Sequence, residues 1–497
     1  MTATESPPTP AAPANPHHER RWLILALLGT AQLMVVLDAT VVNIALPSAQ
    51  KALSFSDANR QWIVTAYSLT FGSLLLLFGR IGDLFGRKRT LIVGLVAFGV
   101  VSAIGGAAQS FGMLVTARAF QGAAGALLAP SALSLLTTTF TEPRERGIAF
   151  GVYGAVAGAG GAVGLLLGGV LTEYLSWRWC LYVNVVIAVP AVLAAIVLLT
   201  NQVPAERPRF DIPGAVAVSL GLFLIVYGFS QAEPRGWTDW ETLGSLIVGV
   251  ILLIVFAVIE RRAPHPLLPL RIVLDRNRGG SYLSVLISGA GLFGVFLFLT
   301  YYLQKTLGYS PVTTGLAFLP MVGMIIVAST TSNAVLLPRL GPKPLVPTGM
   351  LLASIGMVLL AQLGVHSTYV GHILPALLII GLGLGLIFAP SINTATLGVS
   401  QEDAGVASAT VNSCQQVGGS IGTAFLNTIA TTAVTSYLVG KTPTPLVAAQ
   451  AAVHGYTVAF WWAAGIFLLG AVVSGTLLRP GAAAVGLVAE TQPVVAV

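Results

Sequence analysis

Residues 79–89 read Gly-Arg-Ile-Gly-Asp-Leu-Phe-Gly-Arg-Lys-Arg, a charged segment between two long apolar runs. Only 9% of the 497 residues are charged, so five charges within this short stretch need a structural reason. Basic side chains beside a membrane span are retained on the cytoplasmic side, which predicts a cytoplasmic loop here. The glycines allow close helix contact, and the single acid can pair with an arginine or cap the next helix. We expect a cytoplasmic gating motif formed by Gly79, Asp83, Gly86, Arg87, Lys88 and Arg89.

The composition of the chain is that of a membrane protein. Hydrophobic residues make up 55% of it, glycine occurs 55 times and the mean hydropathy is +0.85, which is too apolar for a soluble protein of this length. The net charge of +7 would favour nucleic acid in a soluble domain, but here the bases cluster at the ends of apolar runs. We therefore expect no nucleic-acid partner and predict an all-α polytopic membrane protein embedded in the lipid bilayer.

Fourteen apolar windows are long enough to cross roughly 30 Å of hydrocarbon, which takes about 20 residues. They lie near 22–46, 60–79, 90–108, 112–138, 147–171, 180–200, 212–230, 242–259, 279–303, 313–337, 345–363, 371–397, 405–432 and 457–478. An even number of spans puts both termini on one side. With the N-terminus in the cytoplasm, 18 Lys/Arg lie inside and six outside, and one lies within a span, so both termini are predicted to be cytoplasmic.

Polar stretches divide the spans into groups of six, two and six. We expect an N-terminal six-helix bundle at 20–200 and a C-terminal six-helix bundle at 279–480, with two additional transmembrane helices and a cytoplasmic linker at 201–278. Residues 1–19 read as a disordered cytoplasmic tail and residues 481–497 as a second tail. The two bundles could be pseudo-symmetric halves of one fold.

Several sequence motifs recur at fixed places in the predicted spans. Residues 37–47 read Leu-Asp-Ala-Thr-Val-Val-Asn-Ile-Ala-Leu-Pro, residues 62–67 Trp-Ile-Val-Thr-Ala-Tyr, and residues 118–125 Arg-Ala-Phe-Gln-Gly-Ala-Ala-Gly. The fifth span carries the glycines of an antiporter motif at Gly151, Gly160, Gly164, Gly168 and Gly169. With the segment 79–89, these motifs resemble the fourteen-span drug:proton antiporters of the EmrB/QacA type, within the major facilitator superfamily. One departure is Leu165, where the antiporter motif usually has proline after glycine.

This resemblance implies a major facilitator fold in the bacterial cytoplasmic membrane. It implies a secondary active transporter that exports lipophilic drugs, antibiotics or secondary metabolites in exchange for protons by alternating access. It further implies a protein that is no enzyme, holds no cofactor or metal and functions as a monomer. A proton-coupled importer of a small metabolite with the same fold is the alternative, and the direction of transport separates the two. Whether Na⁺ replaces H⁺ stays open.

Asp38 is the only carboxylate well inside a predicted span, where an ionised acid costs ~2.5–3.5 kcal/mol on insertion. By helical rise, Asp38 lies roughly 12 Å from the outer end of its span and Arg118 roughly 9 Å from the outer end of the fourth. The two could share one polar pocket, in which protonation of the acid depends on its distance from a fixed cation. The alternatives are an acid that only reaches headgroups and an arginine that only ties helix ends together. We take Asp38 and Arg118 as candidate proton-coupling residues.

Catalysis and ATP hydrolysis have little support in the sequence. No span carries paired acids, a His cluster or a Cys/His pair with catalytic spacing. Gly440-Lys441-Thr442 resembles the end of a phosphate-binding loop, but Thr435 stands where that loop needs another glycine. The glycines of the fifth span fit a packed helix seam, whether or not they also gate. We expect the energy for transport to come from a gradient.

Uncharged polar and aromatic side chains could line a substrate cavity, although each of them is individually more often a packing residue. No acid lies within the last six spans, which favours neutral or weakly acidic lipophilic substrates over dications. The candidates for the cavity are Gln32, Gln121, Phe293, Tyr301, Asn412 and Gln415.

Overall fold

The computed structural model describes residues 19–57, 59–140, 142–200, 211–264, 266–397, 399, 403–442 and 444–480, and every regular element within them is a helix. The N-terminal part forms α1 (Arg21–Leu53), α2 (Gln61–Phe85), α3 (Arg87–Gly106), α4 (Phe111–Thr139), α5 (Pro143–Tyr174) and α6 (Trp179–Leu198). The middle forms α7 (Ile212–Arg235), α8 (Trp240–Arg262) and the short α9 (Leu270–Val273). The remainder forms α10 (Arg276–Tyr301), η1 (Tyr302–Thr306), α11 (Pro311–Thr331), η2 (Ser332–Leu336), α12 (Leu337–Leu340), α13 (Pro342–Leu360), η3 (Tyr369–Ile373), α14 (Leu374–Thr396), α15 (Ala404–Leu438) and α16 (Pro445–Leu477), where η denotes a π-helical segment.

Fourteen of the helices in these ranges have 19 residues or more, and each predicted apolar window lies along one of them, some with an adjoining π-helical segment. Eleven helices of the described residues are long and apolar enough to cross a membrane, by length and composition. The all-helical fold class is therefore confirmed.

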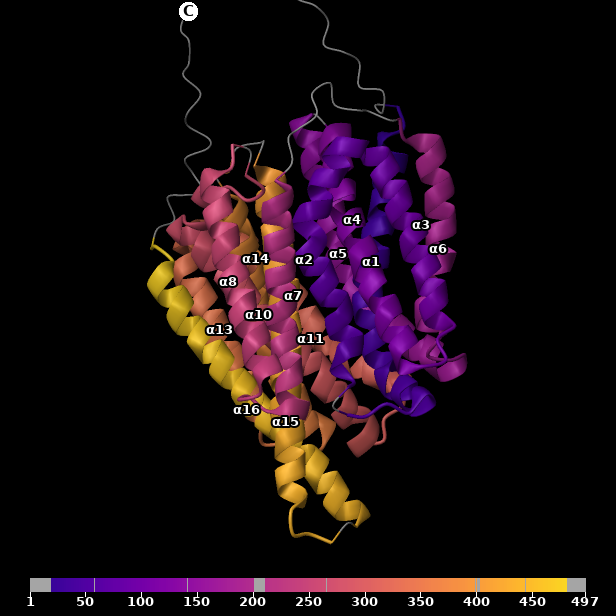
Figure 1. Ribbon diagram of the computed structural model, residues 1–497, viewed down its shortest axis with the longest axis vertical. Coiled ribbons are helices and arrows are strands. Elements are labelled where there is room, and N and C mark those ends of the chain that lie inside the picture. Colours follow the sequence, from indigo (N-terminus) through magenta and orange to yellow (C-terminus); the bar gives the residue numbers. More distant parts are fainter. Residues whose placement is uncertain are drawn as a thin grey trace, which may run out of the picture.

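The last two helices differ most from the predicted windows, because α15 continues to Leu438 and α16 begins at Pro445 rather than near 457. The hydroxyl oxygen of Thr444 accepts from the backbone N–H of Val447 at 3.2 Å, and proline follows at the first helical position. Both features favour a helix start here, and neither contributes to hydropathy. In consequence α15 and α16 project beyond their neighbours at the lower end of Figure 1.

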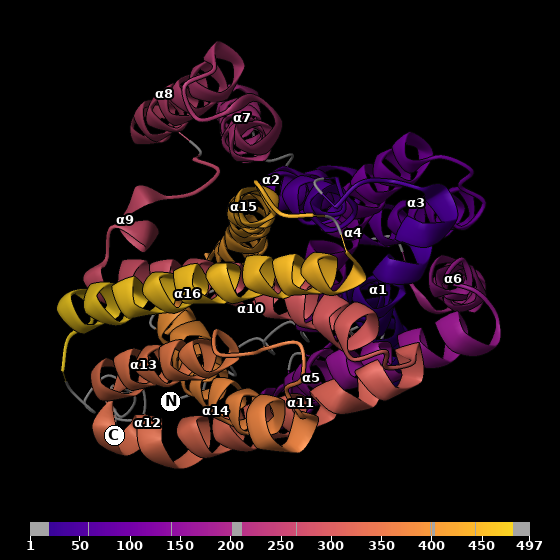
Figure 2. The same ribbon diagram turned by 90° about the horizontal axis from the view of Figure 1, so that it is seen from below.

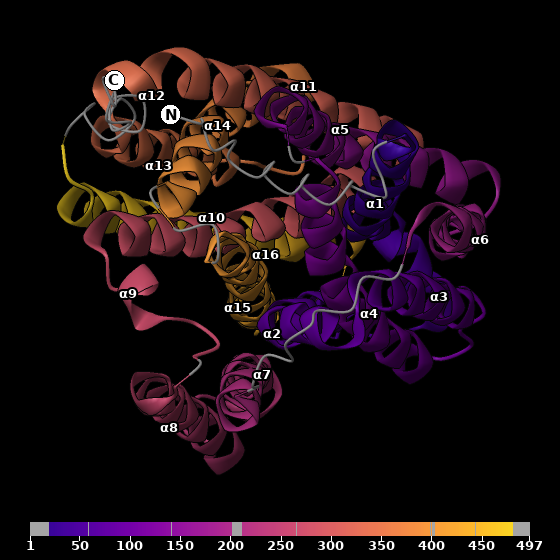
Figure 3. The same cartoon turned by 90° about the horizontal axis from the view of Figure 1, so that it is seen from above.

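The long helices form two packed groups, seen side by side in Figure 1 and end-on in Figures 2 and 3. In the N block, α1 to α6, helix α1 packs against α4, α5 and α6, while α4 packs against α2 and α3. In the C block, α10 to α16, helix α10 packs against α14, α15 and α16, and α13 packs against α14 and α16. The start of α1 and the end of α16 lie at the upper end of Figure 1, the terminal end; the opposite end is the far end.

Among the described residues, two helix pairs make the most extensive contacts between the blocks, α2 with α15 and α5 with α11. Both contacts rely on glycine: a Cβ on Gly72 of α2 would lie 3.1 Å from Gln416, and one on Gly315 of α11 would lie 2.6 Å from the carbonyl oxygen of Leu165. Lipid supplies no hydrophobic drive for helix association, so membrane helices depend on close packing. Small residues allow the backbones to approach this closely.

Helices α7 and α8 pack against each other outside the two blocks. Only α7 of the pair makes extensive contact with the bundle, where it touches both α2 and α15. Ser219 on α7 donates to the carbonyl oxygen of Ser73 on α2 at 2.9 Å, and Thr428 on α15 donates to the carbonyl oxygen of Phe229 on α7 at 3.4 Å. One of the two junctions between the blocks is thus covered by an additional helix.

Candidate functional site

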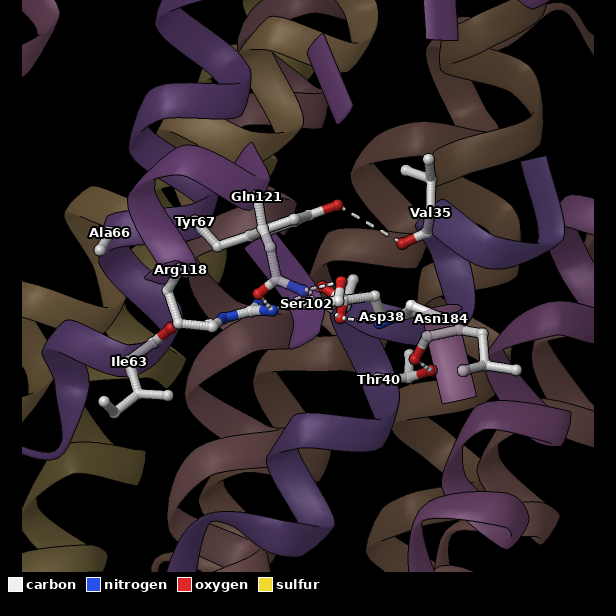
Figure 4. Close-up of polar contacts among 12 residues, drawn as sticks. Val35, Asp38, Thr40, Ile63, Ala66, Tyr67, Ser102, Arg118, Gln121 and Asn184 are labelled. Atoms are coloured by element: carbon white, nitrogen blue, oxygen red, sulfur yellow. Dashed lines mark hydrogen bonds and ion pairs between the residues drawn. The ribbon is translucent and has the colours of Figure 1, made fainter. Parts of the chain in front are cut away.

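Asp38 of α1 and Arg118 of α4 form a buried ion pair inside the N block (Figure 4). The distance from Nη1 of Arg118 to Oδ2 of Asp38 is 2.5 Å, and the exposed fractions of the two residues are 2% and 0%. The depths of Asp38 and Arg118 in their spans predicted that the two residues share one pocket. The structure brings them together as predicted.

Two amide side chains complete the surroundings of this carboxylate. Gln121 donates from Nε2 to Oδ1 of Asp38 at 3.2 Å and to the hydroxyl of Ser102 at 2.6 Å, and its Oε1 accepts from Nη1 of Arg118 at 2.9 Å. Asn184 of α6 donates from Nδ2 to the same Oδ1 at 2.7 Å. We call Asp38, Ser102, Arg118, Gln121 and Asn184 the Asp38 cluster; all five are buried and come from α1, α3, α4 and α6.

Arg118 is held in place from a further side by α2. Its Nε donates to the carbonyl oxygen of Ile63 at 3.1 Å, and its guanidinium carbon lies 4.4 Å from the centre of the Tyr67 ring. The phenol of Tyr67 in turn donates to the carbonyl oxygen of Val35 on α1. Since arginine does not release its proton in proteins, this arrangement fixes a permanent cation beside Asp38.

The charges of Asp38 and Arg118 compensate each other in a buried position. Removing one partner from a buried ion pair leaves an uncompensated charge, which costs roughly 3–5 kcal/mol. Protonation of Asp38 would leave Arg118 in that condition, so uptake of a proton favours a rearrangement of the helices that carry the pair. Among the described residues, no three His, Cys, Asp or Glu side chains gather as metal ligands.

The sequence profile of the Major Facilitator Superfamily matches residues 28–423, most of the chain and all of the Asp38 cluster. The chain belongs to this superfamily. It is accordingly a multi-pass membrane protein of a transporter family and not an enzyme.

The relatives of the chain include resistance and export proteins of Streptomyces and Amycolatopsis. The chain is 51% identical over 461 residues to the puromycin resistance protein pur8 of Streptomyces alboniger, with 92% of each chain covered. It is 40% identical over 410 residues to the cephamycin export protein CmcT of Amycolatopsis lactamdurans, covering 82% of this chain and 84% of that one. Among solved structures, an auto-inhibited POT family peptide transporter matches with a TM-score of 0.65 over 92% of this chain and 96% of its own, at 17% identity, which establishes the fold alone.

The glycine motif of α5 packs against α1, the helix of Asp38. A Cβ on Gly160 would lie 3.1 Å from the Val36 side chain, and one on Gly168 would lie 2.8 Å from the carbonyl oxygen of Val41. Gly164 faces the hydroxyl of Thr40 in the same way. The structure thus gives these glycines a packing role, while the surroundings of Gly151 lie outside the described residues.

One glycine of the motif faces the C block instead. A Cβ on Gly169 would lie 2.7 Å from the carbonyl oxygen of Pro311 at the start of α11. Leu165, the departure from the usual proline, is buried on the same side, and its carbonyl oxygen approaches Gly315. Helix α5 therefore packs on the proton-coupling candidate with one face and on the opposite block with the other.

The loop between α2 and α3 supports its neighbours in the N block. Gly86 has φ of 92°, a left-handed conformation that glycine adopts without strain, and separates the two helices. The ammonium group of Lys88 donates to the carbonyl oxygens of Ile196 at 2.9 Å and Leu199 at 2.5 Å, so it caps the end of α6.

The remaining members of the charged loop are placed less fully. Arg87 reaches the carbonyl oxygen of Ser134 on α4 at 3.4 Å, Arg89 is exposed, and Gly79 packs against Pro130. The side chain of Asp83 lies outside the described residues. Its pairing with Arg87 or Arg89 stays a prediction.

A second polar cluster joins the two blocks at the far end. Arg60, just before α2, donates from Nε to Oδ1 of Asn427 on α15 at 3.0 Å, and its Nη1 lies 3.8 Å from Oδ1 of Asp57. Lys305 of η1 donates to Oε1 of Gln50 on α1 at 3.0 Å, and Gln50 donates to Asp57 at 2.7 Å. We call Gln50, Asp57, Arg60, Tyr301, Lys305 and Asn427 the far-end cluster.

The cavity candidates lie in different surroundings. Gln121 belongs to the Asp38 cluster and Tyr301 to the far-end cluster, and both are fully buried. Gln32 accepts a hydrogen bond from the Tyr153 hydroxyl at 2.7 Å. Asn412 is exposed and donates to the carbonyl oxygen of Ser408 on its own helix.

The other two candidates, Phe293 and Gln415, lie where α10 packs against α15. The Phe293 ring faces Gly419, and the carbonyl oxygen of Gln415 faces Gly289. A role in substrate binding stays a prediction for all six candidates.

Sequence reasoning missed Asn184 and Arg60 as functional candidates. The signal for Asn184 is that it is the single polar residue in the apolar stretch 183–199. Arg60 was counted only as an outer base. Its position directly before the apolar residues of α2 could have suggested partial burial, but its partners on α10 and α15 are more than 200 positions away.

Proposed function

We propose that this protein exports lipophilic antibiotics or related secondary metabolites across the bacterial cytoplasmic membrane in exchange for protons. The pur8 and CmcT similarities support export of antibiotic-like compounds. In the proposed topology all fourteen long helices span the membrane as an N-terminal bundle (20–200), an inserted pair with its linker (201–278) and a C-terminal bundle (279–480), with both termini cytoplasmic. A monomer contains both blocks and suffices.

The observation that carries the proton-exchange part of the proposal is the ion pair between Asp38 and Arg118. A carboxylate with 0% exposure in a membrane protein is expensive and is retained for function more often than for stability. The pair lies entirely within the N block, so proton uptake can change how α1 and α4 pack without direct contact between proton and drug. This supports a coupling site separate from the drug cavity.

Alternating access follows from a rocking of the N block against the C block. Under the proposed topology the far end faces the outside, and the far-end cluster belongs to the state that is closed to the outside. The charged loop 79–89 faces the cytoplasm, where Asp83 with Arg87 or Arg89 serves as the latch of the opposite state. Ion pairs of this kind need to differ between states by only a few kcal/mol to shift the equilibrium.

The substrate pathway lies between the blocks in this proposal, and uncharged groups such as Gln32, Phe293, Asn412 and Gln415 line it. Neutral and weakly charged aromatic compounds suit such a lining, because they bury apolar surface without leaving a charge unpaired. Puromycin is named in the description of pur8, and lincomycin and tetracenomycin C are named in the descriptions of two further Streptomyces relatives of this chain. These three are the first compounds to test.

Transport by purified protein in liposomes tests the proposal directly. The lumen of the vesicles is made acidic, and accumulation of each labelled compound is measured with and without the pH gradient. Gradient-dependent accumulation that Asp38→Asn abolishes supports drug:proton exchange. Movement of compound along with protons would favour the importer, and gradient-independent movement in both proteins would exclude proton coupling.

A further inference from the structure

The two oxygens of Asp38 are unequal in their partners. Oδ2 receives the charged Nη1 of Arg118, whereas Oδ1 receives the neutral amide donors of Gln121 and Asn184. Asn184 itself is 0% exposed, and its Oδ1 has no hydrogen-bond partner among the described residues. An unpaired amide oxygen in so buried a position costs about 1–3 kcal/mol, so it calls for an explanation.

Protonation reverses what Asp38 needs from its neighbours. A proton delivered by hydronium, which leaves as water, turns one carboxylate oxygen into an O–H donor, and a buried donor needs an acceptor. The other titratable groups that face Asp38 are Arg118 on α4, Tyr67 on α2 and Cys180 on α6. Arg118 has no acceptor atom, and the hydroxyl of Tyr67 and the thiol of Cys180 donate to backbone carbonyls of Val35 and Gly168. The amides of Gln121 and Asn184 already lie within hydrogen-bond distance of Oδ1 of Asp38, so an amide oxygen is the acceptor nearest at hand.

Of the two amides, only Asn184 can turn its oxygen toward Asp38. Rotation of the Gln121 amide would place its NH₂ group against Nη1 of Arg118, where Oε1 now accepts at 2.9 Å, and two donors would face each other. Rotation of the Asn184 amide exchanges an unpaired oxygen for an unpaired NH₂ group and breaks only the bond to Asp38. When Asp38 carries the proton, its O–H donates to the rotated oxygen of Asn184, and this new bond replaces the broken one.

We propose that Asn184 is a positioning residue for the proton on Asp38: its amide donates to the carboxylate and, turned by half a rotation, accepts from the carboxylic acid. This inference rests on the proposed role of Asp38 in proton exchange. Gln121, in contrast, serves only the ionised state. The N block thereby holds the neutral acid in position while Arg118, no longer paired with an anion, drives the change of state.

Infrared difference spectroscopy of the purified full-length protein across a pH titration tests the inference. The carboxylic C=O band of Asp38 is assigned by its absence in Asp38→Asn and is then compared in Asn184→Leu, Gln121→Leu and Cys180→Ala. The leucine replacements match the shape of the amides without donor or acceptor. Cys180, one turn before Asn184 on α6, is the matched control because its contacts go to Gly168 and Thr172. Asn184→Ser shortens the side chain but keeps it polar, and it replaces Asn184→Leu if that variant does not fold.

We expect Asn184→Leu to move the carboxylic band of Asp38 to higher wavenumber, because the acid loses its acceptor, and Gln121→Leu and Cys180→Ala to leave the band in place. An unmoved band in Asn184→Leu overturns the assignment of Asn184 alone. The absence of any band that depends on Asp38 overturns the proton role of Asp38 and this inference with it.

Discussion

The guanidinium carbon of Arg60 lies 4.4 Å from the centre of the Tyr301 ring, so a cation at the start of α2 rests on an aromatic face at the end of α10. Arg60 is 3% exposed and Tyr301 0%, and the contact crosses the boundary between the N and C blocks. The rings of Phe298 and Tyr456 lie 5.5 Å and 5.7 Å from the same guanidinium. A desolvated cation–π contact contributes about 2 kcal/mol or more, which makes this a strong closing contact between the blocks.

Arg60→Gln should favour the state that is open at the far end. The contact with Tyr301 is lost, and a difference of about 1.4 kcal/mol already changes the ratio of two states tenfold. A cysteine at Gln304, which donates across the boundary to the carbonyl oxygen of Ile44, reports the opening through the rate of labelling by an impermeant maleimide. Arg235→Gln is the matched control, since Arg235 forms a partly exposed ion pair with Glu241 within the α7–α8 pair. Equal labelling rates in the two variants would contradict a closing role of Arg60.

The far-end cluster should stay closed over a wide pH range. Burial raises the pKa of Asp57, but Arg60, the hydrogen bond from Gln50 and Lys305 outweigh burial and hold this pKa below its ordinary value. A group with a lowered pKa in the folded state contributes its stabilisation above the ordinary value and loses it as the pH falls through the lowered one. The labelling rate of the cysteine at Gln304, divided by that of a free thiol at the same pH to cancel the change in thiolate fraction, should therefore be constant from pH 8 to about 5 and rise only below about pH 4. In Asp57→Asn the acid-induced rise should be absent.

Asp38→Asn should abolish export driven by a pH gradient and leave a folded protein that still binds drug. The amide keeps the size of the side chain and an oxygen that accepts a hydrogen bond from Arg118. Unlike the carboxylate, it takes up no proton at the pH values used for transport. Asp38→Glu should retain part of the activity, because the acid is preserved and only its position changes. Drug binding is measured by tryptophan fluorescence and export in liposomes. Full gradient-driven export by Asp38→Asn would mean that another group carries the proton.

Gly168→Ala should destabilise the protein, whereas Gly161→Ala on the same helix should be nearly neutral. A Cβ on Gly168 would lie 2.8 Å from the carbonyl oxygen of Val41, and backbone cannot move aside as a side chain can. Nothing lies within 4 Å of the corresponding point on Gly161. Overpacking of this kind costs about 1–3 kcal/mol. Unfolding temperatures in detergent check the difference, and equal values would mean that α5 slides away from α1 without penalty.

Export should favour neutral and singly charged aromatic compounds over rigid dications. The predicted lining of the pathway holds amides and rings, and Asp38 itself is fully buried and paired with Arg118. A dication would have to leave water without a carboxylate to receive it, at a cost of several kcal/mol per ion. Export rates of a neutral, monocationic and dicationic dye series of similar size measure this preference. Faster export of the dication would place a further acid, such as Asp403 or Glu402, on the pathway.

The sequence alone predicted every long helix and the meeting of Asp38 with Arg118. Both follow from one-dimensional quantities, the length of apolar runs and the depth of a residue along its helix. The partners of Arg60 and the amide of Asn184 depend on how helices rotate about their axes when they pack, which a run of apolar residues does not encode. The early start of α16 was missed for another reason: Thr444 and Pro445 begin a helix by capping chemistry, which hydropathy does not register.

Helix α7 covers the junction of α2 with α15, and Figures 2 and 3 place α7 and α8 on the opposite side of the molecule from α5 and α11. The two seams between the blocks are therefore unlike in their access to lipid. At the α2–α15 seam, acyl chains meet α7 first, whereas at the α5–α11 seam they meet the moving parts themselves. We expect a compound dissolved in the bilayer to enter by the α5–α11 side. Access from the lipid would then differ between two opposite sides of the transporter within the plane of the membrane.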